Sequence, residues 1–317
     1  MRRSLNLILS ATRVNVVSTL VLVVLSFLAQ PAAADYIQPE QVSIKTESYV
    51  PRDTNFDFGT YDYAVNWQGI PVAKSSVAVI PGRTENGVKT ITVRATVETS
   101  SVIALFYKLK HVSESVFRAD SMAPIIFSSV QTENSRTKSR EVRFGNEGQI
   151  SSTLWSWKTG AAVPEEQHDF KSENTTVDPI TATFLARSLE VNEGQEVGFD
   201  VFNGKHRFLI TLKRGATEKV KVNRIVQEAF RVTPGVKKLT DTEGEKRLRE
   251  ATIWVSTDGR RNILKLESKV FVGAVRAELI RFTPSTPSPG EQGTPPTGSV
   301  RAALQAPAAT ESKGESK

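Results

Sequence analysis

The chain has 317 residues and no cysteine, which excludes disulfides, thiolate metal sites, cysteine nucleophiles and a lipid-modified cysteine. Its formal net charge of +7 falls to +4 when the three arginines of the N-terminal segment (Arg2, Arg3 and Arg13) are removed. A mild charge that is spread along the chain favours solubility over nucleic-acid binding.

The first 34 residues have the pattern of a secretory signal peptide. Three arginines precede an apolar run at residues 20–29, and Ala32, Ala33 and Ala34 supply small residues for cleavage before Asp35. The apolar run is shorter than the roughly 20 residues that cross a bilayer comfortably. We therefore expect cleavage after Ala34, a periplasmic protein and no stable membrane span afterwards. The alternative is an uncleaved anchor over residues 14–29.

The region that follows is dominated by strand patterns. Apolar and polar residues alternate with period two, separated by turn signals such as Pro81-Gly82 and Asn86-Gly87. Strands are predicted at residues 61–70, 72–80, 89–98, 111–119, 125–133, 136–144 and 149–158. The stretch at residues 100–110 is ambiguous, because its apolar run is too short for a confident helix and too continuous for a half-exposed strand.

Residues 178–214 contain the best helix candidate and the clearest hairpin. Asp178 can cap a helix N-terminus and Pro179 suits the first helical position. The helix that follows is apolar over most of its surface, which is typical of a buried helix. Beyond Gly194, two alternating strands flank Asn203-Gly204, a pair suited to a tight type I′ turn.

Further strands are predicted at residues 220–233, 251–256, 262–269 and 271–282. The predicted fold is therefore mainly β: a large antiparallel sheet curled as a spiral or open β-barrel around one buried α-helix. Residues 35–282 form a single domain in this interpretation. Residues 283–317 are rich in Pro, Gly and Ser and poor in large apolar residues, so they predict a disordered tail.

No catalytic motif is visible, and no metal or cofactor site is predicted. The three histidines, His111, His168 and His206, are interpreted as structural or surface residues. His168 and Asp169 do not form a dyad, because adjacent strand residues point to opposite faces. Carboxylates are plentiful, but no pair identifies itself as a glycosidase couple.

Apolar and aromatic side chains are the features above background. The first interpretation is that they fill the core. The second is that the curled sheet does not close on the helix and leaves an apolar cleft for an acyl chain or another hydrophobic ligand. An exposed aromatic pair could also stack on a sugar. The basic residues Arg136, Lys138 and Arg140 could bind an anionic headgroup or form a solvated strand face. The candidate ligand-binding residues are Ile103, Leu105, Phe106, Trp155, Phe184, Leu185 and Trp254.

Four stretches of the chain resemble the bacterial domain-of-unknown-function 3108 family (DUF3108) of exported proteins. They are YDYAVNWQGIPVAKSSVAV at 61–79, SSVIALFYKLKHVSESVF at 100–117, DPITATFLARSLEVNEGQEVGFDVFNGK at 178–205 and IWVSTDGRRNILKLESKVFVGAVRAELIRF at 253–282. Ile263 is a departure, since relatives tend to have a proline after the paired basic residues. The resemblance implies a periplasmic protein with a long sheet rolled about a helix, and it brings no catalytic residues.

Three functions are consistent with these patterns. The first is a non-enzymatic cell-envelope protein that binds a lipid or other apolar ligand between sheet and helix. The second is an interaction scaffold for envelope integrity that holds protein or peptidoglycan partners. The third, less favoured, is an envelope glycan hydrolase.

Overall fold

The computed structural model describes residues 37–46, 49, 51, 56–85, 87–158, 162–240, 251–269 and 273–285. The predicted signal peptide lies outside these residues, as does the predicted tail beyond residue 285. The α-helices are α3 Ser101–Ala104 and α4 Pro179–Ser188, and two 3₁₀ helices, η1 and η2, span Pro39–Gln41 and Asn146–Gly148. The strands are β1 Gly59–Trp67, β2 Ile70–Glu85, β3 Val88–Thr99, β4 Leu109–Arg118, β5 Pro124–Glu133, β6 Arg136–Phe144, β7 Gln149–Trp157, β8 Val163–Lys171, β9 Thr176–Val177, β10 Glu196–Phe202, β11 Arg207–Val222, β12 Ile225–Lys238, β13 Ala251–Ser256, β14 Ile263–Lys269 and β15 Ala274–Pro284.

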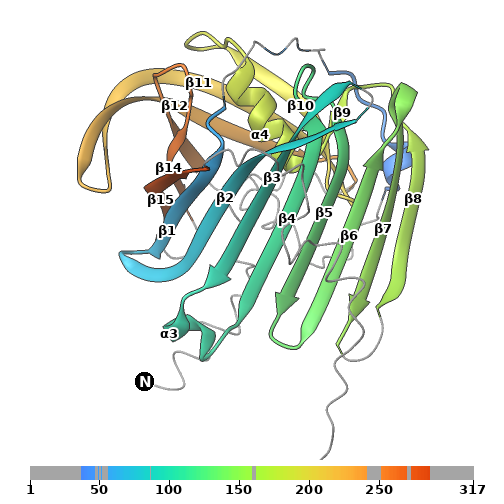
Figure 1. The fold of residues 1–317 in the computed structure, drawn as a ribbon, viewed down its shortest axis with the longest axis horizontal. Coiled ribbons are helices and arrows are strands. Elements are labelled where there is room, and N and C mark those ends of the chain that lie inside the picture. The colour runs from blue at the N-terminus through green and yellow to red at the C-terminus, as the bar shows by residue number, and fades with distance from the viewer. Residues whose placement is uncertain are drawn as a thin grey trace, which may run out of the picture.

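All fifteen strands of the described residues belong to one sheet, in the order β8-β7-β6-β5-β4-β3-β2-β1-β15-β14-β13-β12-β11-β10-β9. Neighbouring strands pair antiparallel except β9 and β10, which are parallel. In Figure 1 strands β2 to β8 run side by side as one broad layer, and the long β11–β12 hairpin curves away from it. The sheet is curled but not closed, because β8 and β9 are its two ends. The prediction of a mainly β fold with a large antiparallel sheet is confirmed.

Most predicted strands match observed ones within a few residues, and the differences have local causes. The predicted strand at residues 220–233 is divided in two, because Asn223 and Arg224 adopt positive φ angles of 45° and 69° and make a tight turn. Strand β8 was not predicted, since its polar sequence VPEEQHDFK lacks apolar alternation. Strand β15 continues to Pro284, two residues into the predicted tail.

The alternation of residues along the strands determines which face is buried. Along β1, Tyr61, Tyr63 and Val65 are buried and the residues between them are partly exposed. The buried faces of the two halves of the sheet meet in one main core, which includes Phe117 and Phe127 of the first half and Phe202 and Phe208 of the second. Because side chains alternate with period two, a one-residue slip of any strand would expose its core residues.

The described residues contain two α-helices where the sequence predicts one. α3 forms within the ambiguous stretch and has no buried residue. α4 matches the predicted helix: Asp178 is its N-cap, Pro179 is its first residue, and seven of its ten residues are buried. It contacts both β4 and β10, which lie in opposite halves of the sheet. The predicted start of this helix is confirmed.

The hairpin between β10 and β11 exists, but the predicted two-residue turn is wrong. Phe202 pairs with Arg207, so residues 203–206 form a four-residue loop. Asn203 closes this loop with its side chain, because its Oδ1 accepts from the backbone N–H groups of Lys205 and His206 at 3.0 and 2.9 Å. An asparagine that bonds its own following backbone favours this wider turn over the type I′ form.

A buried ion pair on the β10–β11 hairpin lies where the two ends of the sheet come together. Arg207 of β11 bonds both carboxylate oxygens of Asp200 on β10, and the two side chains are almost inaccessible to solvent. The same guanidinium donates to the carbonyls of Pro39 and Val42 at 3.1 and 2.9 Å and to Ser172 Oγ, which follows β8, at 3.3 Å. One side chain therefore connects the N-terminal segment, the end of β8 and the β10–β11 hairpin.

We expect Arg207→Met to destabilise the fold by about 3–5 kcal/mol, because it leaves the Asp200 carboxylate buried without its partner. The matched control is Arg281→Met, which breaks the pair between Asp62 and the largely exposed Arg281 and should cost only about 0–1 kcal/mol. Urea unfolding of both variants measures the difference. Equal losses in the two variants would show that the Arg207 pair has no special role in holding the two ends of the sheet together.

Candidate functional site

A cavity of about 90 Å³ lies between α4 and strands β10 to β14. α4 supplies one wall and the inner faces of the strands supply the other. The residues that line it are Ala182, Thr183, Ala186, Arg187, Leu189, Val191, Val197, Phe199, Ile210, Leu212, Arg214, Phe230, Val232, Pro234, Ile253, Val255, Arg261 and Ile263. Most of these side chains are aliphatic or aromatic, so the body of the cavity is apolar.

The sequence of α4 explains why space remains there. Ala182 and Ala186 are four residues apart, so they lie one above the other on the same helix face and place only methyl groups toward the sheet. Phe184 projects from the helix in another direction, with its ring 5.1 Å from that of Phe56 and 5.7 Å from that of Phe117. The helix therefore packs large side chains against the first half of the sheet and small ones toward the second.

The strand wall of the cavity is unusually accessible for the inner face of a sheet. Val197, Leu212, Phe230 and Val232 all line the cavity, yet each is only partly buried. Thr183 and Ala186 on the helix wall are also partly exposed. Apolar side chains on an inner sheet face are normally covered by packing neighbours. Here the two walls do not meet, which leaves an apolar hollow between them.

The position of α4 depends on its buried N-cap. Asp178 accepts from the backbone N–H groups of Ile180 and Thr181 at 2.8 and 3.0 Å, and from the hydroxyl of Ser115 on β4 at 2.8 Å. Thr181 Oγ1 also donates to this carboxylate at 2.5 Å. Burial raises the pKa of Asp178, and these donors oppose that rise. The cap thus attaches the start of α4 to the first half of the sheet.

The other end of α4 is held by two arginines that bind each other's backbone. Arg187 donates to the carbonyls of Arg261 and Arg260, both at 2.9 Å, and to Asn262 Oδ1 at 2.8 Å. Arg261 in turn donates to the carbonyls of Arg187 and Leu189. A cation at these last carbonyls also suits the negative end of the helix dipole. Burial lowers the pKa of Arg187.

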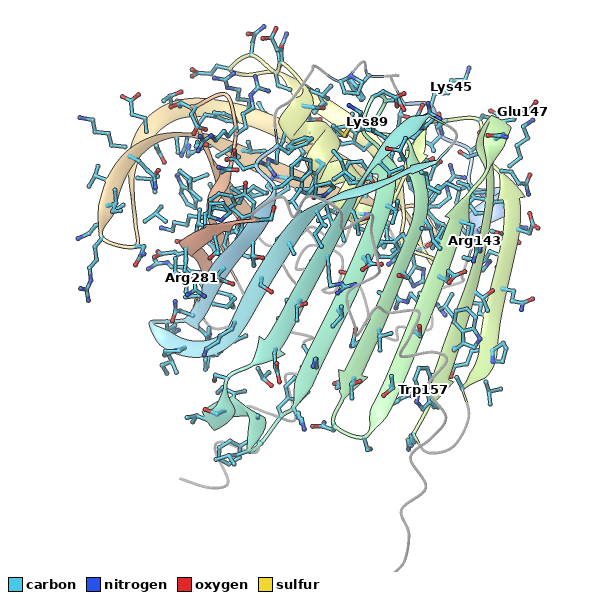
Figure 2. The ribbon with its side chains drawn as sticks, viewed as in Figure 1. Lys45, Lys89, Arg143, Glu147, Trp157 and Arg281 are labelled. Atoms are coloured by element: carbon cyan, nitrogen blue, oxygen red, sulfur yellow. The ribbon has the colours of Figure 1, made fainter. Side chains whose placement is uncertain are left out.

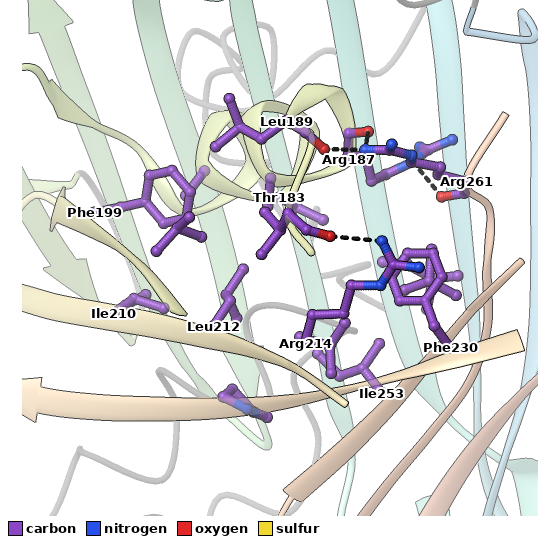
Figure 3. Close-up of a pocket in the computed structure, with 18 residues that line it drawn as sticks. Thr183, Arg187, Leu189, Phe199, Ile210, Leu212, Arg214, Phe230, Ile253 and Arg261 are labelled. Atoms are coloured by element: carbon purple, nitrogen blue, oxygen red, sulfur yellow. Dashed lines mark hydrogen bonds between the residues drawn. The ribbon is translucent and has the colours of Figure 1, made fainter. Parts of the chain in front are cut away.

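A third arginine, Arg214, completes a cationic end of the cavity. Its guanidinium lies 4.5 Å from the centre of the Phe230 ring, and Nη1 donates to the Val191 carbonyl at 2.6 Å. Its Nε is buried and has no acceptor among the residues that the structure describes. Figure 3 shows Arg187, Arg214 and Arg261 beside Phe230 at one end, with Phe199, Ile210 and Leu212 farther along the cavity. Backbone carbonyl oxygens accept hydrogen bonds from all three of these guanidinium groups.

The seven residues predicted from the sequence to bind a ligand do not line this cavity. Phe184 and Leu185 belong to the main core. Ile103, Leu105 and Phe106 lie at α3, which Figure 1 places at the opposite end of the strands from α4. Trp155 lies on the opposite face of β7 from the buried Ile150 and Leu154. Trp254 lies on the face of β13 opposite the cavity residues Ile253 and Val255, and its Nε1 donates to Glu218 at 2.7 Å.

The sequence interpretation therefore placed a cleft between sheet and helix but named other side chains for it. The alanine pair and the arginines were missed. A signal was present in the spacing of Ala182 and Ala186, two small residues four apart in a helix of otherwise larger apolar residues. The arginines gave no such signal, because Arg187, Arg214 and Arg261 are brought together only by the fold.

The histidines are integrated into the packing. His111 is buried on β4, and burial together with nearby Arg140 lowers its pKa to about 3. Burial and neighbouring cations, Lys238 first among them, lower the pKa of His206 to about 2, and its Nδ1 lies 3.0 Å from Thr240 Oγ1. His168 Nε2 lies 3.0 Å from Glu166, two residues away on the same face of β8.

No group of three potential metal ligands occurs among the described residues. In the same part of the chain, no helix is long and apolar enough to cross a membrane.

We expect Asp178→Ala to lower the free energy of unfolding by about 2 kcal/mol or more, because two amide groups and two buried hydroxyls lose their acceptor. Asp178→Asn retains one acceptor oxygen for the amides and should lose less. Chemical denaturation of both variants tests this order. An alanine variant as stable as wild type would show that the cap does not hold α4.

Comparison with known proteins gives a family and a fold resemblance. No curated protein matches the sequence. Among solved structures, a β-barrel-like DUF1849 protein from Brucella abortus is 9% identical over 75% of this chain and 99% of its own, with a TM-score of 0.45. A Bacteroides fragilis protein described as exported, with a YmcC-like fold, is 8% identical over 74% and 100%, with a TM-score of 0.32. A protein of Parabacteroides distasonis described as a lipoprotein is 8% identical over 74% and 100%, with a TM-score of 0.35.

The family assignment agrees with the resemblance seen in the sequence. The sequence model of the family described as "Protein of unknown function (DUF3108)" matches residues 62–280. This range contains β2 to β14 completely and most of β1 and β15. The chain belongs to the DUF3108 family.

Proposed function

We propose that the chain is an exported, non-enzymatic protein that binds a lipid-like ligand in the cavity between α4 and β10 to β14. The single observation that carries this function is the apolar hollow itself, whose walls leave Val197, Leu212, Phe230 and Val232 partly uncovered. Its volume of about 90 Å³ is well below the roughly 300–1,000 Å³ of pockets for drug-sized ligands. A narrow alkyl chain therefore fits it better than a bulky ring system. The signal-peptide pattern of residues 1–34 supports export.

The charged end of the cavity specifies the ligand further. Arg214 is held over Phe230 with a buried Nε that lacks an acceptor among the described residues. Arg187 and Arg261 lie at the same end and bond carbonyl and amide oxygens. Charge-assisted bonds from arginine are strong and suit carboxylate or phosphate groups. The proposed ligand is thus an anionic amphiphile with its chain along the apolar walls and its head group near Arg214.

A substitution that fills the hollow should remove binding. Ala186→Leu adds three carbon atoms on the helix wall, and we expect the folded state to tolerate it within about 1–3 kcal/mol. Native mass spectrometry of gently purified wild-type protein should show a reproducible added mass, which organic extraction identifies and which the variant lacks. Ala64→Leu is the control, because Ala64 lies on the face of β1 opposite the core residues Tyr63 and Val65. A bare mass for wild type under conditions that preserve lipid complexes would contradict the proposal and favour the scaffold function.

The head-group preference can be measured with matched probes. Decanoate and 1-decanol have the same chain length and differ in charge, so we expect wild type to bind decanoate about tenfold more tightly in calorimetric titration. Arg214→Gln should lose most of this preference and keep its affinity for 1-decanol. If wild type binds both probes with equal affinity, the result would still support an apolar binding cavity. It would contradict the proposal that the arginines recognise a charged head group.

A further inference from the structure

A second group of apolar side chains, none of which lines the cavity, is exposed at the surface of the molecule. It lies at the end of the strands where α3 is placed. Val102, Leu105 and Phe106 of α3 and its following turn are 66%, 80% and 64% exposed. Ile70 at the β1–β2 turn and Val163 at the start of β8 are each more than half exposed. With the partly exposed Trp157, these residues are named the α3 edge: Ile70, Val102, Leu105, Phe106, Trp157 and Val163.

Hydrogen bonds and strand pairing connect the neighbouring turns that carry the α3 edge. The β1–β2 region bonds α3 through Ser100, whose N–H donates to the Val72 carbonyl at 2.9 Å and whose hydroxyl donates to the Pro71 carbonyl at 3.1 Å. On the other side, Lys108 and Asn134 exchange two bonds between the α3 turn and the β5–β6 turn. Thr137 of β6 pairs with Trp157 of β7. Figure 2 places Trp157 at the same lower end of the sheet that Figure 1 shows for α3.

The charges around the α3 edge are mainly positive. Exposed cationic side chains lie on its strands and turns: Lys74, Lys108, Lys110, Arg136, Lys138 and Lys158. The acidic residues at this end are fewer, and each lies beside a cation or a hydrogen-bond donor. Glu133 accepts from the Tyr107 hydroxyl at 2.9 Å, Glu165 pairs with Arg136 at 3.3 Å, and Glu98 lies opposite Lys74 and Lys110 in the strand register.

Apolar tips surrounded by lysines and an amphipathic aromatic side chain suit the boundary of a bilayer. Apolar side chains insert at the boundary between the lipid head groups and the acyl chains, and lysines contact anionic head groups. Tryptophan is favoured at this membrane interface. Here the apolar groups come from several turns at the ends of strands. We propose that the α3 edge docks the protein on an anionic lipid surface, with Leu105 and Phe106 as the inserting side chains.

The test uses the mature full-length protein and sedimentation with vesicles of phosphatidylcholine, with and without phosphatidylglycerol. Wild type is expected to bind the vesicles that contain phosphatidylglycerol. Leu105→Asp/Phe106→Asp should lose at least about tenfold in partition, because both side chains then carry charge into the acyl boundary. Both residues are exposed in the fold, so the variant should keep the wild-type circular dichroism spectrum and melting temperature.

The chain offers a matched control at another tip. Ile225 and Val226, at the β11–β12 turn, are 64% and 61% exposed and lie near Lys221 and Arg224. Ile225→Asp/Val226→Asp should leave vesicle binding within about twofold of wild type if α3 is the docking edge. A second variant, Lys108→Gln/Lys110→Gln, should weaken binding only to vesicles with phosphatidylglycerol.

Several outcomes would overturn the proposal. These are the absence of vesicle binding by wild type, equal binding with and without phosphatidylglycerol, or a larger loss at Ile225 and Val226 than at Leu105 and Phe106. Sedimentation velocity tests the alternative that the α3 edge binds a second copy of the chain. Self-association that disappears in Leu105→Asp/Phe106→Asp, without vesicle binding, would assign the α3 edge to a second copy of the chain.

Discussion

The contact that holds together the two ends of an open sheet is the constraint on which the rest of this molecule depends. A sheet of fifteen strands in one linear order leaves two edges with unpaired backbone groups. The Arg207–Asp200 pair brings those ends together, because its guanidinium also holds the residues after β8 and the N-terminal segment. A buried charge pair is costly unless every donor finds an acceptor, and here carbonyl and hydroxyl oxygens complete the set.

Helix α4 lies between two halves of one sheet, and it packs large side chains against one half and small side chains against the other. Its buried cap, Asp178, fixes the helix start to β4, and Phe184 packs between Phe56 and Phe117. Toward β10 to β14 it presents Ala182 and Ala186, so packing on that side is incomplete. Incomplete packing normally reduces stability, since the lining atoms lose their contact partners. A fold that keeps such a hollow beside three arginines has the features of a ligand site, and this is the physical basis of the proposed function.

The cavity and the α3 edge lie at different ends of the strands and depend on different interactions. The cavity combines an apolar wall with arginines that bond carbonyl oxygens, which is the basis for proposing a ligand with both a chain and an anionic head group. The α3 edge combines exposed apolar tips with flexible lysines, which suits a fluid surface rather than a shaped pocket. A lipid-binding protein that also docks on a lipid surface would be close to the membrane that contains its ligand.

Much of the fold could be predicted from local patterns. Period-two alternation located most strands, and Asp178-Pro179 located the start of α4, because capping and strand burial depend on residues close together in the chain. β8 and the four-residue loop after β10 were missed, since a polar edge strand lacks alternation and the Asn203 side chain selected a different turn. The sequence by itself determined a large antiparallel sheet with one capped helix in its middle. Only the tertiary structure decided which residues line the cavity, because Arg187, Arg214 and Arg261 meet through the curl of the sheet, and no local pattern encodes a contact between residues so far apart in the chain.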